Sequence, residues 1–456
     1  MKQRWTLQFE HVGRMREGAV RIAPLMLFTG DNNAGKSYVM ALLWGVIALG
    51  RELFPESPPE NESYQRCEDW LRACIGNETK VGDDEARPLV AWFGDVLNHR
   101  RKTLCDAVFG EGRIQPKTLR LRDYCREKPL MLRWNDSPME TARYSRGADY
   151  VRFPLPGVKP SRADLYRMIR YLTWNLVMGD LSAPLFQMMS PLNPIPRGEI
   201  LYLPAARTGF VLMRKQLASI ALSGSFGHLE EATLPLSLPT RRFVQRLVGL
   251  THNEQGKYAA IADQLERDII RGSLRPDAAP LPDYQYRPSG TATTAIPLWL
   301  TSSLVTELAP LLMFLRSRDD FRSLIIEEPE AHLHLEMQGR LARALVRLVN
   351  SGLPVWLTTH GDSLFQQFSN LVKASALGHN QLSALGMEEQ ETLKPTEVTA
   401  WHFKVQPSGD GRDGTRISPL EVSASGIAAT AFNDSLVRLT KETISLNSHQ
   451  GLGDET

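Results

Sequence analysis

The residues with the clearest chemistry are two adjacent carboxylates, Glu327 and Glu328, at the end of an apolar run. The residues before them, 324–326 (LII), predict a buried strand. Because unpaired charge is costly to remove from water, acids delivered to the end of a buried strand need a partner. A divalent cation with a phosphate chain is the usual partner, and two solvated acids at a strand end are the alternative.

A second segment far upstream matches the pattern G-x-x-x-x-G-K-[ST] in full, from Gly30 to Ser37 (GDNNAGKS). Apolar residues at 24–29 predict a strand before it, and the apolar run from Ser37 predicts a helix after it. We therefore expect a loop whose backbone N–H groups cradle phosphates at a helix N-terminus. Lys36 is expected at the β- and γ-phosphates and Ser37 on Mg²⁺. The expected nucleotide-binding residues of this loop are Gly30, Asn33, Ala34, Gly35, Lys36 and Ser37.

A third polar residue, His360, follows another apolar run at 353–359. A helical pattern at 337–349 separates this run from the acidic pair, which predicts a strand–helix–strand unit. Such a unit places His360 and Glu328 at the same edge of a sheet. There the histidine is able to contact a γ-phosphate or an attacking water, although a purely structural histidine is the alternative.

With these motifs the chain resembles ABC-type ATPases of the OLD/RecF/SMC-related group, catalogued as AAA-15 or AAA-21 domains. The resemblance covers the first fifty residues and roughly 200–375. It includes the segment 201–209 (LYLPAARTG), and 301–311 is similar to the family's signature helix. It implies an α/β fold, namely an ABC-type P-loop nucleotide-binding domain with a mixed sheet. It also implies that Ser302 and Ser303 approach a nucleotide held by a second copy.

The resemblance further implies roles for the polar residues. Glu328 is the expected general base, with His360 beside it, and Glu327 and Ser37 are the expected Mg²⁺ ligands, so that ATP and Mg²⁺ are the cofactors. Two departures from the family are that Glu327 replaces the usual Asp and that the signature lacks the Gly-Gln of transporter-type relatives. For Arg207 two interpretations remain, a sensor of nucleotide or partner and a structural ion pair.

The stretch between the P-loop and the signature predicts a largely helical insertion. Repeated prolines between 154 and 196 interrupt it, so a long coiled coil is disfavoured. Helices are expected at 62–74, 85–108, 161–178, 240–250 and 256–271, a hairpin at 276–297, strands at 399–405 and 416–422, and a final helix at 433–446. The predicted division is 1–55 for the first part of the ATPase core, 56–198 for the insertion, 199–375 for the rest of the core, and 376–456 for C-terminal elements that complete it.

Composition is that of an ordinary globular protein of 456 residues, with 42% hydrophobic and 23% charged residues. The net charge of +2 gives no general case for nucleic-acid binding, but the segment 100–133 is rich in Lys and Arg. That segment is either a solvated surface or a contact for DNA or an acidic phage protein. Four cysteines without C-x-x-C spacing predict reduced thiols, and no apolar stretch predicts a membrane span, so a cytoplasmic location is expected.

Three functions are compatible with this sequence. The leading hypothesis is an ATP-hydrolysing sensor or scaffold, resembling the ATPase subunits of bacterial anti-phage systems of the PARIS type. In that interpretation the chain forms a homo-oligomer and controls a separate effector, a Toprim nuclease. The part of the chain after His360 is expected to be too short to contain a Toprim domain itself. The alternatives are a RecF-like repair ATPase that clamps DNA and a regulator whose ATPase times a protein interaction.

Overall fold

A six-stranded sheet forms the centre of the computed structural model, which describes residues 1–135, 144–156, 160–186, 195–224, 236–250, 256–277, 282–290, 294–407, 413–428 and 440–446. The strand order is β16-β15-β3-β14-β13-β9. All neighbouring strands are parallel except β15 and β16, which are antiparallel. The sheet is therefore mixed, as expected. Its strands are β3 (Leu25–Gly30), β9 (Leu201–Leu203), β13 (Leu324–Glu327), β14 (Val355–Thr358), β15 (Val398–Pro407) and β16 (Asp413–Leu420).

The three central strands are buried on both faces, so their side chains alternate between two hydrophobic cores. In β3, Met26 belongs to one core and Leu27 to the other. In β13 and β14, Ile325 and Trp356 enter the first core, while Ile326 enters the second. This alternation explains why each strand is a continuous apolar run in the sequence.

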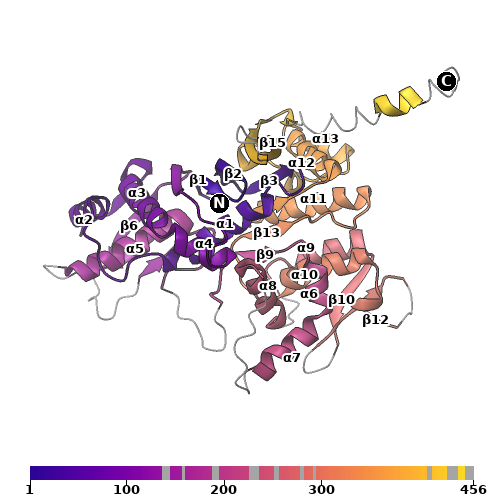
Figure 1. Ribbon diagram of the computed structural model, residues 1–456, viewed down its shortest axis with the longest axis horizontal. Coiled ribbons are helices and arrows are strands. Elements are labelled where there is room, and N and C mark those ends of the chain that lie inside the picture. Colours follow the sequence, from indigo (N-terminus) through magenta and orange to yellow (C-terminus); the bar gives the residue numbers. More distant parts are fainter. Residues whose placement is uncertain are drawn as a thin grey trace.

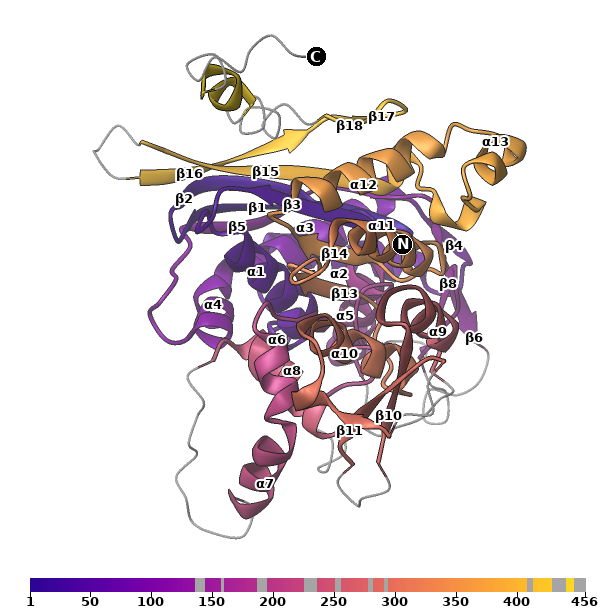
Figure 2. The ribbon, with the colours of Figure 1, turned by 90° about the vertical axis from the view of Figure 1, so that its right-hand side faces the viewer.

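Helices cover both faces of this sheet (Figure 2). The helix after the P-loop, α1 (Lys36–Leu49), packs in the first core and is buried nearly all round. On the other face lie α10 (Ser303–Arg316), α11 (Leu335–Asn350) and α12 (Asp362–Ala374). These positions confirm the strand and helix predicted on either side of the P-loop, and the strand–helix–strand unit predicted between the acidic pair and His360.

A second, antiparallel sheet has the order β2-β1-β5. Its strands are β1 (Gln3–Val12), β2 (Met15–Arg21) and β5 (Thr118–Arg126). The predicted N-terminal strands are thus present, but β5 comes from the segment predicted to be a separate insertion. The insertion and the N-terminal strands consequently share one sheet.

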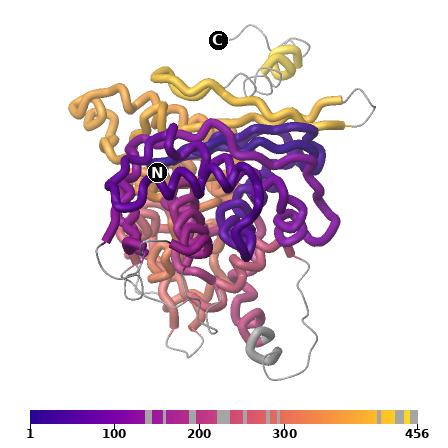
Figure 3. The backbone as a smooth tube through the Cα atoms, turned by 90° about the vertical axis from the view of Figure 1, so that its left-hand side faces the viewer, coloured from indigo at the N-terminus to yellow at the C-terminus, as the bar shows by residue number. Residues whose placement is uncertain are grey.

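The insertion contains more strand than the largely helical prediction. Its described residues form four helices and a four-stranded sheet in the order β4-β6-β8-β7. The insertion lies at one end of the molecule (Figures 1 and 3). The predicted helix at 85–108 is two helices that meet at Arg100. The elements are α2 (Glu62–Cys74), β4 (Thr79–Val81), α3 (Asp83–His99), α4 (Arg101–Phe109), β6 (Leu130–Asn135), β7 (Ser145–Arg146), β8 (Tyr150–Pro154) and α5 (Arg162–Met178). No helix among the described residues forms a long coiled coil; α3 and α5 have 17 residues each.

The remaining elements surround the second core. The predicted helix at 240–250 begins earlier, at Leu238, with Ser237 as its N-cap and Pro239 in its first turn, where proline is compatible with a helix. The predicted hairpin at 276–297 is a three-stranded antiparallel sheet. Residues 440–446 of the predicted final helix are helical, and the rest of that prediction lies outside the described residues. The elements are α6 (Arg207–Leu212), α7 (Arg214–Gly224), α8 (Leu238–Val248), α9 (Ala259–Leu265), the π-helix η2 (Glu266–Ile270), β10 (Gly272–Pro276), β11 (Tyr284–Pro288), β12 (Ile296–Pro297), η3 (Leu298–Leu300), α13 (His379–Ala384), β17 (Val422–Ser423) and β18 (Gly426–Ile427).

Two further expectations concern the cysteines and membrane-spanning helices. All four cysteines are free, and three of them are buried, in agreement with the prediction of reduced thiols. None of the helices in the described ranges is long and apolar enough to cross a lipid bilayer.

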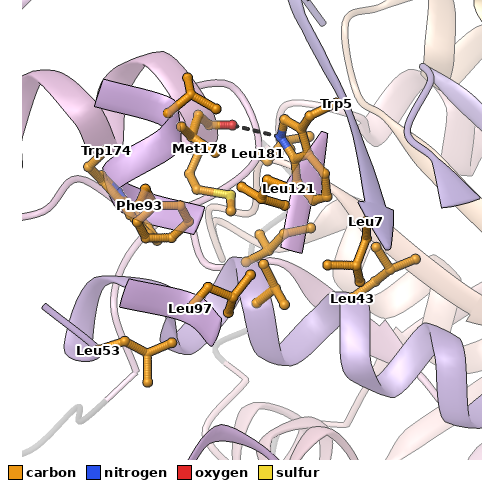
Figure 4. Packing of buried hydrophobic residues seen from close by; sticks show 14 of the residues in the cluster. Trp5, Leu7, Leu43, Leu53, Phe93, Leu97, Leu121, Trp174, Met178 and Leu181 are labelled. Atoms are coloured by element: carbon orange, nitrogen blue, oxygen red, sulfur yellow. Dashed lines mark hydrogen bonds between the residues drawn. The ribbon is translucent and has the colours of Figure 1, made fainter. Parts of the chain in front are cut away.

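A buried side-chain hydrogen bond joins β1 to α5 of the insertion (Figure 4). The indole Nε1 of Trp5, on β1, donates to the carbonyl oxygen of Val177 at 3.0 Å. Val177 lies in the last turn of α5, where carbonyl groups have no partner within the helix. Trp5 therefore both fills the first core and satisfies the end of α5.

We predict that Trp5→Phe lowers the free energy of unfolding by about 1–3 kcal/mol, because it leaves a buried carbonyl without its donor. Trp134→Phe is the matched control: its Nε1 donates to the carbonyl of Asn77 at 3.0 Å, but that bond is exposed. We expect the control to change stability by less than about 1 kcal/mol. Urea unfolding measures both, and equal effects of the two substitutions would contradict the prediction.

Candidate functional site

Three adjacent parallel strands bring the predicted site residues together. β3 ends in the P-loop, β14 ends before His360, and β13 ends at the acidic pair, so their carboxyl ends meet at one edge of the sheet. Backbone hydrogen bonds continue past the strands: Thr359 N–H donates to the oxygen of Phe28 at 2.9 Å, and Glu328 N–H to that of Thr358 at 3.0 Å. The placement of His360 and Glu328 at one sheet edge is confirmed.

The P-loop adopts a conformation that requires its glycines. Gly30 has a φ of 118°, and a Cβ there would lie 2.1 Å from the carbonyl oxygen of Phe403. Gly35 has a φ of 94° at the start of α1. Asp31 attaches the loop to β15, since its N–H donates to the Phe403 oxygen at 2.9 Å and its Oδ2 accepts from Val405 N–H at 2.8 Å. The loop is therefore held on the sheet.

The ammonium group of Lys36 is buried inside the loop. Its Nζ donates to the carbonyl oxygens of Gly30 at 2.8 Å and Asp31 at 2.7 Å, and it lies 3.4 Å from His360 Nδ1. Burial lowers the pKa of Lys36 to about 8, against the opposing effect of Glu328. Phosphate oxygens entering the loop would offer this ammonium stronger partners than two neutral carbonyls.

His360 connects Lys36 to Glu328. Its Nε2 is 3.3 Å from Oε1 of Glu328, and its side chain is 33% exposed. Burial, and then the charge of Lys36, lower the pKa of His360, so the ring is neutral near pH 7. A neutral ring accepts from Lys36 at Nδ1 and donates from Nε2 to Glu328, which fixes its tautomer.

Glu328 has an unusual backbone. Its φ is 44°, in the left-handed region, and Pro329 follows it and restricts it further. Such a conformation costs about 1–3 kcal/mol and persists only where the surroundings enforce it. Here its N–H is bound by Thr358 and its carbonyl accepts from Arg207 at 3.0 Å. Its carboxylate is held in a defined place, yet the side chain remains 42% exposed and open to a ligand.

The expected metal ligands, Ser37 and Glu327, differ in their surroundings. Ser37 is exposed at the start of α1. Glu327 is buried, and its Oε2 accepts from Ala205 N–H at 3.1 Å. Burial, and then the nearby charge of Glu327, raise the pKa of Tyr202 well above its usual value. The hydroxyl of Ser37 and the carboxylate of Glu327 are hard oxygen donors of the kind that Mg²⁺ binds beside phosphates, so the residues present fit that ion.

Arg207 is only 1% exposed, so in this chain it does not reach a ligand. It forms an ion pair with Glu307, which is also buried. Of the two interpretations left open by the sequence, this geometry agrees with the structural ion pair. Ser302 and Ser303 are exposed at the N-terminus of α10, with Ser302 as N-cap. Their approach to a second copy's nucleotide remains a prediction.

Sequence reasoning missed Glu330, which organises the segment around His360. Its side chain is buried, and its Oε1 accepts from Thr359 Oγ1 at 2.5 Å, from His360 N–H at 3.0 Å and from Gly361 N–H at 3.1 Å. These bonds set the position of the His360 backbone. The only sequence signal was a third acid two residues after Glu328, which does not distinguish this role from a solvated loop.

A scan of protein-family models and a search of curated proteins find no match to this sequence. Among solved structures the chain is similar to an Smc head bound to the C-winged helix domain of ScpA, with 10% identity, 91% of this chain and 97% of that one covered, and a TM-score of 0.35. It is also similar to the SMC head domain from Thermotoga maritima (11%, 92% and 99%, TM-score 0.34) and to a Pyrococcus furiosus Smc head with an extended coiled coil bound to the C-terminal domain of ScpA (10%, 97% and 100%, TM-score 0.33).

The lowered pKa of Lys36 predicts that any phosphate binding by this loop depends on pH. Below about pH 8 the ammonium is charged; above it the free protein loses this proton, so binding a polyanion requires taking the proton up again. We predict that affinity for Mg²⁺–ATP falls as pH rises from about 8, by up to about tenfold per pH unit. Titration calorimetry in buffers of different ionisation enthalpy measures the affinity and the proton uptake together. An affinity that stays constant from about pH 7 to 9, as for a lysine of ordinary pKa, would contradict this.

Proposed function

We propose that this chain binds ATP with Mg²⁺ and hydrolyses it. The observation that carries the proposal is the continuous series of contacts from Lys36 through His360 to Glu328 at the mouth of a P-loop. A strand-end carboxylate beside a phosphate loop is the arrangement that phosphoryl-transfer sites need to orient a water molecule. At the same edge of the sheet, Ser37 and Glu327 supply hard oxygen donors for Mg²⁺.

Each residue has one task in this proposal. The P-loop backbone and Lys36 bind the phosphates, and bound Mg²⁺ supplies charge neutralisation at the phosphate oxygens. Glu328 orients the attacking water as general base. His360, neutral with a proton on Nε2, gives up its contact with Glu328 and donates to a γ-phosphate oxygen. Glu330 keeps the His360 backbone in place during this exchange.

Two substitutions separate binding from turnover. Lys36→Ala is expected to abolish ATP binding, because it removes the only ammonium in the loop. Glu328→Gln keeps the shape of the side chain but not the base, so we predict unchanged binding and a turnover about 10²- to 10⁴-fold lower. A fluorescent ATP analogue reports binding, and phosphate release reports turnover. Undiminished hydrolysis by Glu328→Gln would refute the assignment of the base, and unaltered affinity in Lys36→Ala would refute the nucleotide site.

The proposal includes a homo-oligomer in which two copies enclose two nucleotides. Ser302 and Ser303 are exposed, and the residues just before them are apolar yet exposed: Trp299 by 67% and Leu300 by 61%. Exposed large apolar side chains beside a polar helix end support a face that another protein covers. In Glu328→Gln, ATP is held without turnover, so ATP-dependent assembly is best measured with that variant by light scattering.

For the biological role, we propose that this chain is a sensor or scaffold subunit of an anti-phage system and that it controls a separate effector, a Toprim nuclease. Support comes from the resemblance of the Glu-Glu pair and of the segment 201–209 to such ATPases. The test is copurification of the tagged chain with the products of adjacent genes, with and without ATP, together with plaque assays. Failure to recover any nuclease, combined with undiminished phage growth, would reject the anti-phage role without affecting the proposed ATPase activity.

A DNA-clamping ATPase is the second candidate, because part of the basic segment is accessible. Arg100 and Lys102 are exposed near the junction of α3 and α4. Other members are engaged: Arg101 donates to the carbonyls of Asn98 and Pro116, and Arg133 pairs with Glu78. Fewer of these side chains are therefore available to contact a ligand than the sequence count indicates.

For this candidate we predict that Arg100→Glu combined with Lys102→Glu weakens DNA binding and reduces its salt dependence. The control is Lys373→Glu combined with Lys394→Glu, which makes the same charge change at exposed lysines outside the basic segment. Fluorescence anisotropy with duplex DNA at several salt concentrations measures both. If the wild-type protein shows no salt-dependent DNA binding, the DNA-clamp candidate is rejected.

A further inference from the structure

Arg207 joins the end of β13 to the helix that carries Ser302 and Ser303. Its Nη1 donates to the carbonyl oxygen of Glu327 at 2.5 Å, and its Nη2 to that of Glu328 at 3.0 Å. On its other side it pairs with the Glu307 carboxylate, and its Nε donates to the Glu307 carbonyl at 3.3 Å. One guanidinium group therefore contacts the backbone of both acids and a residue of α10.

Glu307 lies one helical turn after Ser303, at the exposed end of α10. It is 2% exposed, and its second oxygen accepts from the hydroxyl of Thr208. Both partners are buried, so water cannot replace either one if this end of α10 shifts. A shift must therefore move the guanidinium group of Arg207 or leave the charges of Arg207 and Glu307 unpaired.

Arg207 also contacts Glu328, the residue whose backbone has a positive φ. Glu328 needs outside contacts to keep its φ of 44°, and Arg207 supplies the bond to its carbonyl. The carboxylate that approaches His360 is thus positioned by a group whose own position depends on α10.

We propose that the Arg207–Glu307 pair transmits the position of the Ser302–Ser303 end of α10 to Glu328. Docking of this end on a nucleotide held by a second copy then sets the geometry of the acid in this chain's own site. Arg207 and Glu307 are positioning residues that make turnover in one site depend on occupation of the other. This inference rests on the proposed ATPase function.

The same helix provides a matched control at its other end. Arg316 of α10 pairs with Glu266, and these side chains are 6% and 5% exposed. Glu266 also accepts from Leu274 N–H and pairs with Arg275, and none of these contacts involves the strand ends at the site. Glu266→Gln, on η2, thus makes the same chemical change at similar burial, in an ion pair with the other end of α10.

The experiment uses Glu307→Gln in the full chain. We expect ATP affinity within about twofold of wild type and kcat lower by about 10- to 100-fold, as for a misplaced catalytic group. Glu266→Gln is expected to lower Tm at least as much but to keep kcat. In case Glu307→Gln does not fold, Thr208→Val removes one hydrogen bond to the same carboxylate and is expected to lower kcat in the same direction.

A double-mutant cycle with Ser303→Ala tests the transmission itself. If the pair carries the effect of α10, Ser303→Ala lowers kcat by a smaller factor in the Glu307→Gln background than in wild type. Factors that simply multiply, or a kcat in Glu307→Gln equal to that of Glu266→Gln, would overturn the inference. A wild-type chain that binds no ATP would instead overturn the proposed function, so the two failures are distinguishable.

Discussion

The parallel register of β3, β14 and β13 is the constraint on which the whole site depends. Each strand is buried on both faces, and its side chains alternate between two cores, as Met26 and Leu27 do. A slip of one residue would exchange these cores and is therefore strongly disfavoured. Because the register is fixed, the three strands end at the same level. The strand ends themselves therefore place the P-loop, His360 and Glu328 next to one another.

The charges gathered at this edge are compatible with burial only because each has a partner. Lys36 is held by two carbonyls, Glu330 by two N–H groups and a hydroxyl, and Arg207 by Glu307 and the strand-end carbonyls. Removing one member of such a set leaves a desolvated charge, which costs more than the pair itself contributes. The side chains of Glu328 and His360 are more exposed than those of Lys36, Glu330 and Arg207, so they are the ones accessible to a ligand.

Much of the fold followed from patterns that act over short distances. Apolar runs identified β3, β13 and β14, and the P-loop motif placed α1, because strand and helix formation at these points depends on consecutive residues. The insertion was less predictable. β5 pairs with β1 across more than a hundred residues, and its partner is invisible to local periodicity. The break between α3 and α4 at Arg100 was likewise missed, because no proline or glycine marks it.

The sequence alone determined which residues gather at this edge of the sheet: the glycines, lysine and serine of the P-loop, the acidic pair and His360, since their spacing relative to apolar runs already assigned them to strand ends. Only the tertiary structure decided how they are held. That Glu330 binds the His360 backbone, that Arg207 is buried against Glu307, and that Glu328 adopts a positive φ all depend on groups distant in sequence. Every residue type carries the same backbone N–H and carbonyl groups apart from proline, so hydrogen bonds to these groups leave no pattern in the sequence from which they could be predicted.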